Sequence, residues 1–131
     1  MNSDPQRIVI LQYNLNRCQP TLHSLLNHSD SKTLIILAVQ EQYYSKLTNT
    51  TLSHPSWTLI EPPRTEANIN PRVAIYINNR TLQSNTYETL NYPSSDVVIL
   101  KLTTDDSQSM LLINIYNIKD TSLINNLVRF L

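Results

Sequence analysis

The chain has 131 residues and contains no glycine, although average usage of about 7% would give roughly nine glycines. Its 40% hydrophobic content and its ten basic against ten acidic residues exclude a collagen-like, coiled-coil or strongly charged disordered chain. The length predicts one domain with a core of its own, and the absence of glycine predicts that other residues, chiefly the fifteen asparagines, form the tight turns.

The first elements along the chain are predicted to form a strand-helix-strand unit. Residues 7–12 (RIVILQ) are an apolar, β-branched run, which predicts a buried strand. From Pro20 to about His28, three leucines recur at helical spacing, and a proline is acceptable near a helix start. Residues 33–40 (TLIILAVQ) are the second apolar run and predict the second strand.

The middle of the chain is more polar. Residues 41–56 have no clear period, although two tyrosines and a leucine within them are compatible with a short helix. Residues 57–60 predict a short strand that ends before a Pro-Pro pair. Residues 73–77 (VAIYI) predict a further strand, and the Asn-Asn pair after it is a turn signal that replaces Asn-Gly.

The last third of the chain follows a polar linker. Residues 96–102 (DVVILKL) and 110–116 (MLLINIY) predict two more strands, and residues 121–131 carry apolar side chains at helical spacing. The sequence contains no internal repeat. Together these patterns predict an α/β layered domain with about six strands and two helices.

Composition gives little direct information about partners. The zero net charge provides no global attraction to nucleic acid or to an anionic membrane. The single Cys18 cannot form an internal disulfide, and we identify neither a signal peptide nor a membrane span, so we expect an intracellular protein, nuclear or cytoplasmic. Three Asn-x-Ser/Thr sequons would matter only in a secreted chain.

Polar residues cluster where the predicted strands end. Asn14 and Asn16 follow the first strand, residues 40–42 (QEQ) end the second, and Tyr116 and Asn117 end the last. In layered α/β folds the carboxyl ends of strands converge on ligands, and one carboxylate among amide oxygens suits Mg²⁺. The alternative is that the asparagines are ordinary turn residues and the glutamate is simply solvated.

The order of the segments IVILQYNLNR, ILAVQEQYY, SWTLIEPP, PRVAIYI and LLINIYN resembles the endonuclease/exonuclease/phosphatase superfamily. More narrowly, it resembles the endonuclease domain of non-LTR (LINE-type) retrotransposons, and the similarity runs from Ile8 to Asn117. The resemblance implies that residues 1–131 are the N-terminal half of a four-layer α/β sandwich of the DNase I-like type.

The resemblance also implies roles for individual residues. Glu41 matches the acidic ligand of the catalytic Mg²⁺ or Mn²⁺, and Asn14 matches the asparagine that helps to organise the metal, the attacking water or the phosphate. Tyr116 matches the tyrosine whose hydroxyl contacts the scissile phosphate. Asn16 stands where relatives carry Asp or Asn, and Arg72 lies in the Pro-Arg-Val-Ala segment, where a structural and a DNA-facing role are equally open.

Two neighbouring positions are less well defined. Tyr43 has a ring that can stack on unpaired bases or pack against its own chain. Gln42 stands where this branch of the family commonly has proline, which leaves the shape of the following loop open.

The chain lacks two segments that relatives carry further on, Gly-Asp-Phe-Asn and Ser-Asp-His. Phosphodiester hydrolysis needs a positioned water, a base and stabilisation of the developing charge, and the three histidines do not obviously replace the missing groups. We therefore expect a truncated metal-dependent DNA endonuclease domain that is inactive alone. The alternatives are a non-catalytic binding or effector protein derived from a decayed retroelement, and a small secreted or structural domain with an accidental resemblance.

Truncation also predicts an unusual surface. The chain should hold much of one sheet and lack most of its partner, which would leave an apolar face that monomeric proteins rarely expose. We expect self-association through this uncovered face, DNA as the partner of a completed domain, and no membrane partner.

Overall fold

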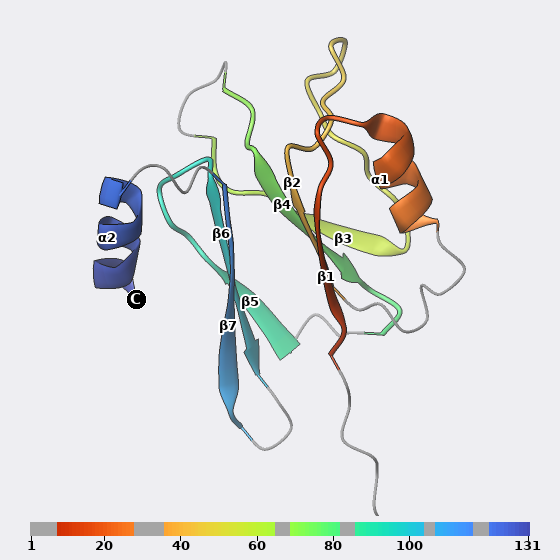
Figure 1. Ribbon diagram of the computed structural model, residues 1–131. Helices are drawn as coiled ribbons and strands as arrows, with labels where there is room; N and C mark the ends of the chain where they lie inside the picture. The colour runs from red at the N-terminus through yellow and green to blue at the C-terminus, as the bar shows by residue number, and fades with distance from the viewer. Residues whose placement is uncertain (1–7, 28–35, 65–68, 82–85, 104–106, 117–120) are drawn as a thin grey trace, which may run out of the picture.

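The computed structural model describes residues 8–27, 36–64, 69–81, 86–103, 107–116 and 121–131. Within these ranges the chain forms seven strands and two helices (Figure 1). The elements are β1 (Ile10–Asn14), α1 (Gln19–Leu26), β2 (Ile36–Gln40), β3 (Trp57–Ile60), β4 (Val73–Asn78), β5 (Tyr87–Leu90), β6 (Val97–Thr103), β7 (Ser109–Ile115) and α2 (Thr121–Phe130). Arg7, His28, residues 33–35 and Asn117, which the sequence places at predicted element ends, lie outside the described residues.

The strands form two sheets. The first sheet has the order β1-β2-β4-β3, with β1 and β2 parallel and the other neighbours antiparallel. The second sheet has the order β5-β6-β7 and is antiparallel throughout. The two sheets pack face to face, since β2 and β4 contact β7 and β4 also contacts β6.

Alternating side chains of each strand point to opposite faces, and this divides the core into three layers. Between the sheets lie Ile36, Ala38, Val73, Ile75, Ile77, Val98, Leu100 and Leu102. The other face of the first sheet packs on α1, and the other face of the second sheet packs on α2. The order α1, first sheet, second sheet, α2 is a four-layer α/β sandwich, the architecture that the family resemblance implied.

This arrangement explains the continuous apolar runs of the central strands. All six residues of β4 are buried, as are the first four of β2, because both faces of these strands are covered. Trp57, on β3, is buried against α1 and donates its indole N–H to the carbonyl of Leu26 at 2.9 Å. The prediction that Trp57 anchors a covering helix on the sheet is confirmed.

Two expectations about the sheets are wrong. A second sheet, with three of the seven described strands, packs on the first, so the first sheet does not present the expected large uncovered face. The first apolar run is not a buried strand, because every residue of β1 is exposed. β1 is the edge strand of the first sheet, and the facing edge strand of the second sheet, β7, lies over β2 and β4.

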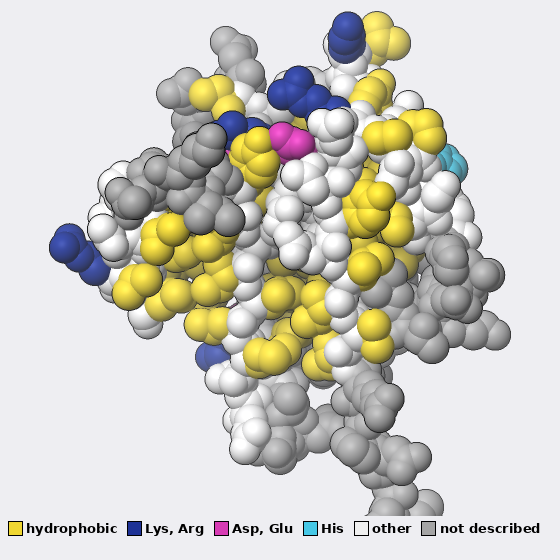
Figure 2. Space-filling view, viewed as in Figure 1, with side chains coloured by type: hydrophobic (Ala, Val, Ile, Leu, Met, Phe, Trp, Pro, Cys, Tyr) yellow, Lys and Arg dark blue, Asp and Glu magenta, His cyan; other side chains and the backbone are white. Residues whose placement is uncertain are grey.

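Among the described residues, β1 and β7 carry two neighbouring groups of exposed apolar side chains, and others lie at the end of α2 and at Leu47 and Ile69. Val9, Ile10 and Leu11 on the β1 side are 37–41% exposed, and Met110 and Leu111 on β7 are 42% and 43% exposed. Figure 2 shows hydrophobic side chains spread over the face that carries these two strands. Edge strands with apolar side chains and free backbone groups favour pairing with another chain.

We expect this face to produce concentration-dependent self-association, which Leu11→Lys should reduce because a lysine on an edge strand opposes edge-to-edge pairing. Leu47→Lys is the matched control, since Leu47 is 96% exposed in a loop away from any strand. Sedimentation velocity over a range of protein concentrations measures the effect. A wild-type chain that stays monomeric at every concentration would contradict this expectation.

Three local predictions also need correction. Residues 41–56 contain turns and no helix, and β5 forms within the segment that the sequence presents as a polar linker. The Asn78-Asn79 turn is present, with the N–H of Thr81 donating to the carbonyl of Asn78, but neither asparagine has a positive φ. This turn is therefore not the left-handed type that usually requires Asn-Gly.

Candidate functional site

The site is built where strand ends from both sheets meet. β2 and β4 are antiparallel and Gln40 pairs with Val73, so the next residues outward, Glu41 and Arg72, lie side by side. The N–H of Glu41 donates to the carbonyl of Arg72 at 2.8 Å. β1 ends at the same edge because it is parallel to β2, and the N–H of Leu15 donates to the carbonyl of Gln40 at 2.9 Å.

The second sheet brings Tyr116 to the same edge. Val97 pairs with Ile115, which places Asp96 and Tyr116 next to each other, and the N–H of Tyr116 donates to the carbonyl of Asp96 at 2.9 Å. The Tyr116 hydroxyl reaches across to the first sheet and donates to Glu41 Oε1 at 2.5 Å. Two residues separated by 75 positions in the sequence are thus joined directly.

Glu41 leaves the end of β2 in a conformation that a non-glycine residue rarely adopts. Its φ is 51°, in the left-handed region, and its carbonyl accepts the N–H of Arg17 at 2.7 Å. Its second carboxylate oxygen, Oε2, accepts no hydrogen bond from the residues described. Such strain persists only where the surroundings enforce it, and it is commonly found at ligand-binding positions.

The contact with Glu41 changes the ionisation of Tyr116. The hydrogen bond from its hydroxyl to the carboxylate, followed by burial, raises the pKa of Tyr116 above its ordinary value. Tyr116 therefore stays protonated and remains a hydrogen-bond donor throughout the physiological pH range.

Arg72 holds Tyr116 in place from the other side. Its guanidinium makes two hydrogen bonds to Asp96, from Nε at 2.9 Å and from a terminal nitrogen at 2.7 Å, and lies 4.7 Å from the centroid of the Tyr116 ring. Such forked pairing and stacking on a ring are typical of arginine. These contacts give Arg72 a structural role. Its side chain is 43% exposed, so a DNA-facing role is still open to it.

The asparagine that ends β1, Asn14, forms a turn with Asn16. The side-chain oxygen of Asn14 accepts the N–H of Asn16 at 3.0 Å, and Asn16 has a φ of 48°. This is the ordinary turn interaction of asparagine. A carbonyl oxygen has two lone pairs, so the turn still leaves Asn14 able to accept one further ligand.

A shallow pocket opens beside Glu41. Its walls are formed by Arg17, Glu41, Gln42, Tyr43, Tyr44, Lys46, Ile69, Asn70, Pro71 and Arg72, and its volume is about 760 Å³. Three of these side chains are cationic and one is acidic. Figure 2 shows Lys and Arg side chains gathered around an acidic side chain at one end of the molecule. Because Asp96 neutralises Arg72, Arg17 and Lys46 against Glu41 give the pocket a small positive charge.

The oxygen atoms present suit a hard divalent cation only in part. No group of three or more His, Cys, Asp or Glu side chains gathers anywhere in the described part of the chain. Glu41 offers one carboxylate, and Mg²⁺ accepts one or two protein carboxylates while keeping several waters. The donor set therefore fits an ion that retains most of its hydration shell and fills its remaining positions from a bound ligand.

The sequence matches no protein-family model and no curated protein. Among solved structures, the chain is similar to the endonuclease domain of TRAS1, a telomere-specific non-LTR retrotransposon, with a TM-score of 0.62 and 16% sequence identity. The chain has a DNase I-like fold. The similarity covers 95% of this chain and 51% of the other, so this sequence spans about half the length of that endonuclease domain.

Sequence patterns predicted some residues of this candidate site and not others. Asn14, Asn16, Glu41, Arg72 and Tyr116 lie at one edge, and Tyr43 lines the adjoining pocket. Three further residues went unnoticed, namely Asp96, which pairs with Arg72, and the pocket cations Arg17 and Lys46. The available signals were Arg17 directly after Asn16, Lys46 five residues after Glu41, and Asp96 at the start of a predicted strand.

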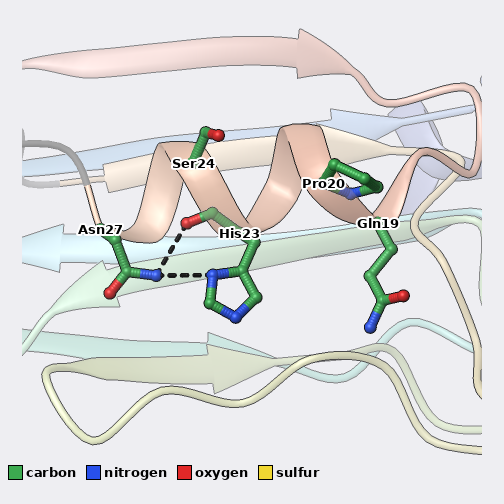
Figure 3. Close-up of a pocket in the computed structure, with 5 residues that line it drawn as sticks. All are labelled: Gln19, Pro20, His23, Ser24 and Asn27. Carbon is green, nitrogen blue, oxygen red and sulfur yellow. Dashed lines mark hydrogen bonds between the residues drawn. The ribbon is translucent and has the colours of Figure 1, made fainter.

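A second hollow lies on α1 and shares no wall with the Glu41 pocket (Figure 3). Asn27 donates to the carbonyl of His23 at 2.8 Å and contacts the His23 ring nitrogen Nδ1 at 2.9 Å. His54 Nε2 contacts the same amide, through its oxygen, at 3.0 Å. These two histidines therefore join the end of α1 to the turn before β3, and they do not reach the Glu41 pocket.

Tyrosine ionisation predicts how stability depends on pH. The pKa of Tyr44 and of Tyr76 is raised chiefly by burial, and that of Tyr116 chiefly by its hydrogen bond to Glu41. The folded state holds these protons more tightly than the unfolded chain does. The stability they contribute is complete below the unfolded pKa of about 10 and is lost as pH rises beyond it.

We therefore expect the urea midpoint to hold from neutral pH to about pH 9 and to fall above about pH 10. Tyr44→Phe should lower stability at neutral pH, because the hydrogen bond to Glu61 is lost, and should make the alkaline fall less steep. Circular dichroism in urea at stepped pH measures both effects. A midpoint that stays constant to about pH 11 would show that these hydroxyls ionise as freely in the folded state as in the unfolded one.

Neither helix in the ranges that the structure describes is long and apolar enough to cross a bilayer.

Proposed function

We propose that this chain carries the metal-binding half of a metal-dependent phosphodiesterase site, of the kind that cleaves DNA in retrotransposon endonucleases. The observation that supports this most is the direct hydrogen bond between Glu41 and Tyr116 beside a locally positive pocket. A carboxylate for a cation, a neutral hydroxyl for a phosphate oxygen and cations for the DNA backbone are three of the parts that phosphodiester chemistry needs.

Each residue has a distinct task in this proposal. Glu41 holds a hydrated Mg²⁺ or Mn²⁺ with help from the Asn14 carbonyl oxygen, and a bound ion of this kind stabilises negative charge on a phosphoryl oxygen. The Tyr116 hydroxyl, which donates to Glu41 in the DNA-free chain, would turn to donate its hydrogen bond to a phosphate oxygen when DNA is bound, and Arg72 keeps the ring of Tyr116 in position. Arg17 and Lys46, which line the pocket, contact backbone phosphates, and Tyr43 on the pocket wall and Asn16 in the turn with Asn14 contact the passing DNA.

The chain alone is proposed to bind DNA without cleaving it. Hydrolysis requires a base within hydrogen-bond reach of the attacking water. His23 and His54 are engaged with Asn27 at α1, away from the pocket walls, and the sequence carries neither Gly-Asp-Phe-Asn nor Ser-Asp-His. A non-catalytic binding or effector protein is the second candidate, and the positive pocket supports it equally.

DNA binding and nicking are tested together. We expect the chain to bind short duplex DNA with salt-dependent affinity and to leave supercoiled plasmid intact in Mg²⁺ or Mn²⁺. Changing both Arg17 and Lys46 to Gln should reduce the slope of log affinity against log salt by about two, since each phosphate contact contributes about one unit. Lys101→Gln is the control, because Lys101 lies on β6 and pairs with Glu88 at 3.7 Å.

The outcomes separate the two candidates. If the chain binds DNA without nicking it, and the Arg17 and Lys46 changes weaken binding equally with and without divalent metal, the result supports the binding or effector protein. Binding that strengthens with Mn²⁺ and loses this gain in Glu41→Gln supports the phosphodiesterase half-site. Nicking that disappears in Glu41→Gln would support the site and overturn the proposal that the chain is inactive alone, and an equal loss of slope in Lys101→Gln would show that the pocket is not where DNA binds.

A further inference from the structure

A pair of side-chain amides crosses from one sheet to the other just beneath the site. Gln40, the last residue of β2, donates from Nε2 to Asn114 Oδ1 on β7 at 3.0 Å. Asn114 donates in turn to the carbonyl of Val39 at 2.9 Å and to the carbonyl of Ala74 at 3.0 Å. The Gln40 oxygen accepts from Gln12 Nε2 on β1 at 3.0 Å, so the chain of bonds joins β1, β2, β4 and β7.

Asn114 is an unusual residue for its place in the fold. It is 3% exposed, and it interrupts the apolar run of β7 where the two sheets pack together. Burying an amide is costly unless it is hydrogen-bonded, and here the oxygen and both N–H groups have partners. Fully satisfied polar networks of this kind make a core rigid and fix one arrangement of its parts.

The position of the pair relates it to Glu41 and Tyr116. Gln40 directly precedes Glu41, and Asn114 lies two residues before Tyr116. The apolar contacts between the sheets are non-directional and do not by themselves set how far the end of β7 lies from the end of β2. The hydrogen bond from Gln40 to Asn114 is directional and sets that spacing.

We propose that Gln40 and Asn114 are positioning residues that hold the Tyr116 hydroxyl within hydrogen-bonding distance of the Glu41 carboxylate. This spacing is a property of the metal-free chain and stands without any activity. Its consequence for metal binding rests on the function proposed above. The structure places neither Gln40 nor Asn114 among the pocket walls, so both act through their neighbours.

Gln40→Met tests the inference most cleanly, because methionine keeps the length of the side chain, and Gln40 lies at a half-buried strand end where the change should not prevent folding. Gln12→Met is the matched control. It removes the exposed bond from Gln12 to Gln40 and leaves the bond between the sheets intact. Glu41→Gln is the reference, since it removes the carboxylate that Tyr116 contacts.

The readout is the ¹³Cζ signal of Tyr116 in tyrosine-labelled protein without metal, assigned with Tyr116→Phe, because this carbon senses what the hydroxyl donates to. We expect Gln40→Met to move the signal most of the way to its position in Glu41→Gln, and Gln12→Met to leave it in place. A Gln40→Met signal that coincides with wild type, in a protein whose other tyrosine signals are unchanged, would overturn the inference.

Asn114→Asp provides a second test, because aspartate keeps the size and the acceptor and removes both donors to the first sheet. If it folds, its Tyr116 signal should move as in Gln40→Met, and an unmoved signal would count against the inference. Mn²⁺ affinity of the same variants separates the two proposals. A moved signal with unchanged affinity leaves the positioning role standing and shows that ion binding does not depend on the contact between Tyr116 and Glu41.

Discussion

Replacing Glu41 with Gln is expected to weaken Mn²⁺ binding by at least about tenfold, because even the loss of a residue that only supports a metal ligand costs about that much. Glu41 supplies a carboxylate oxygen that the described part of the chain does not use. The amide of glutamine keeps the shape and removes the charge. Electron paramagnetic resonance of free Mn²⁺ in a titration measures the affinity directly.

Glu61→Gln is the matched control for this experiment. Glu61 also accepts a tyrosine hydroxyl, that of Tyr44, at 2.5 Å, and it too is half-buried. It lies outside the pocket walls, so its removal should leave Mn²⁺ affinity unchanged. Equal weakening in the two variants would mean that the ion responds to total charge and that Glu41 has no special role.

Trp57→Ala is expected to lower the free energy of unfolding by about 3–5 kcal/mol, the usual cost of truncating a large buried aromatic side chain. Trp57 is 4% exposed and packs between α1 and the first sheet with Leu22, Leu26 and Tyr76. Its indole also donates to the carbonyl of Leu26 at 2.9 Å, a bond that the alanine variant loses. Urea unfolding followed by circular dichroism measures the change.

Two further variants show whether the loss of stability comes from the buried Trp57 side chain. Trp57→Phe should cost less, because it keeps most of the packing and loses chiefly a hydrogen bond of about 1 kcal/mol. Leu47→Ala, at a side chain that is 96% exposed, should stay within about 0.5 kcal/mol of wild type. If Trp57→Ala were no worse than Leu47→Ala, α1 would not depend on this contact.

Periodicity reveals which segments are strands better than it reveals what covers them. The apolar runs of β2 and β4 predict strands that are buried on both faces, and both are. The run that forms β1 looks the same in the sequence, yet β1 is exposed, because its burial depends on a neighbouring strand and not on its own residues. β5 (YETL) was missed since its polar half resembles the linker around it.

The candidate site, too, could be predicted from the sequence only in part. The rule that strand ends converge is enough to bring Glu41 and Tyr116 together, because it needs only the order of the strands. Strand order does not predict the hydrogen bond between the amides of Gln40 and Asn114. Gln40 and Asn114 are 74 residues apart, and Asn114 reads as a lone polar residue within an apolar strand. Only the packing of one sheet on the other shows what it binds.

The absence of glycine is resolved only in part by asparagine. The described residues with positive φ are Asn16, Arg17, Glu41, Asn49 and Ser107. Asparagine tolerates this conformation best, and the remaining residues adopt it at a cost. Two of the strained residues, Arg17 and Glu41, are hydrogen-bonded to each other through the backbone and line one pocket. The strain is therefore concentrated at the candidate site.

The site itself is tested most directly by paramagnetic broadening of backbone amide signals during a Mn²⁺ titration of the wild-type chain. A bound Mn²⁺ broadens nearby signals strongly, so the residues lost first locate the ion. We predict that Glu41, Tyr116 and Asn14 broaden first, and that Glu41→Gln abolishes this selective loss. Broadening that begins elsewhere, or that is uniform across the chain, would contradict a metal site at Glu41.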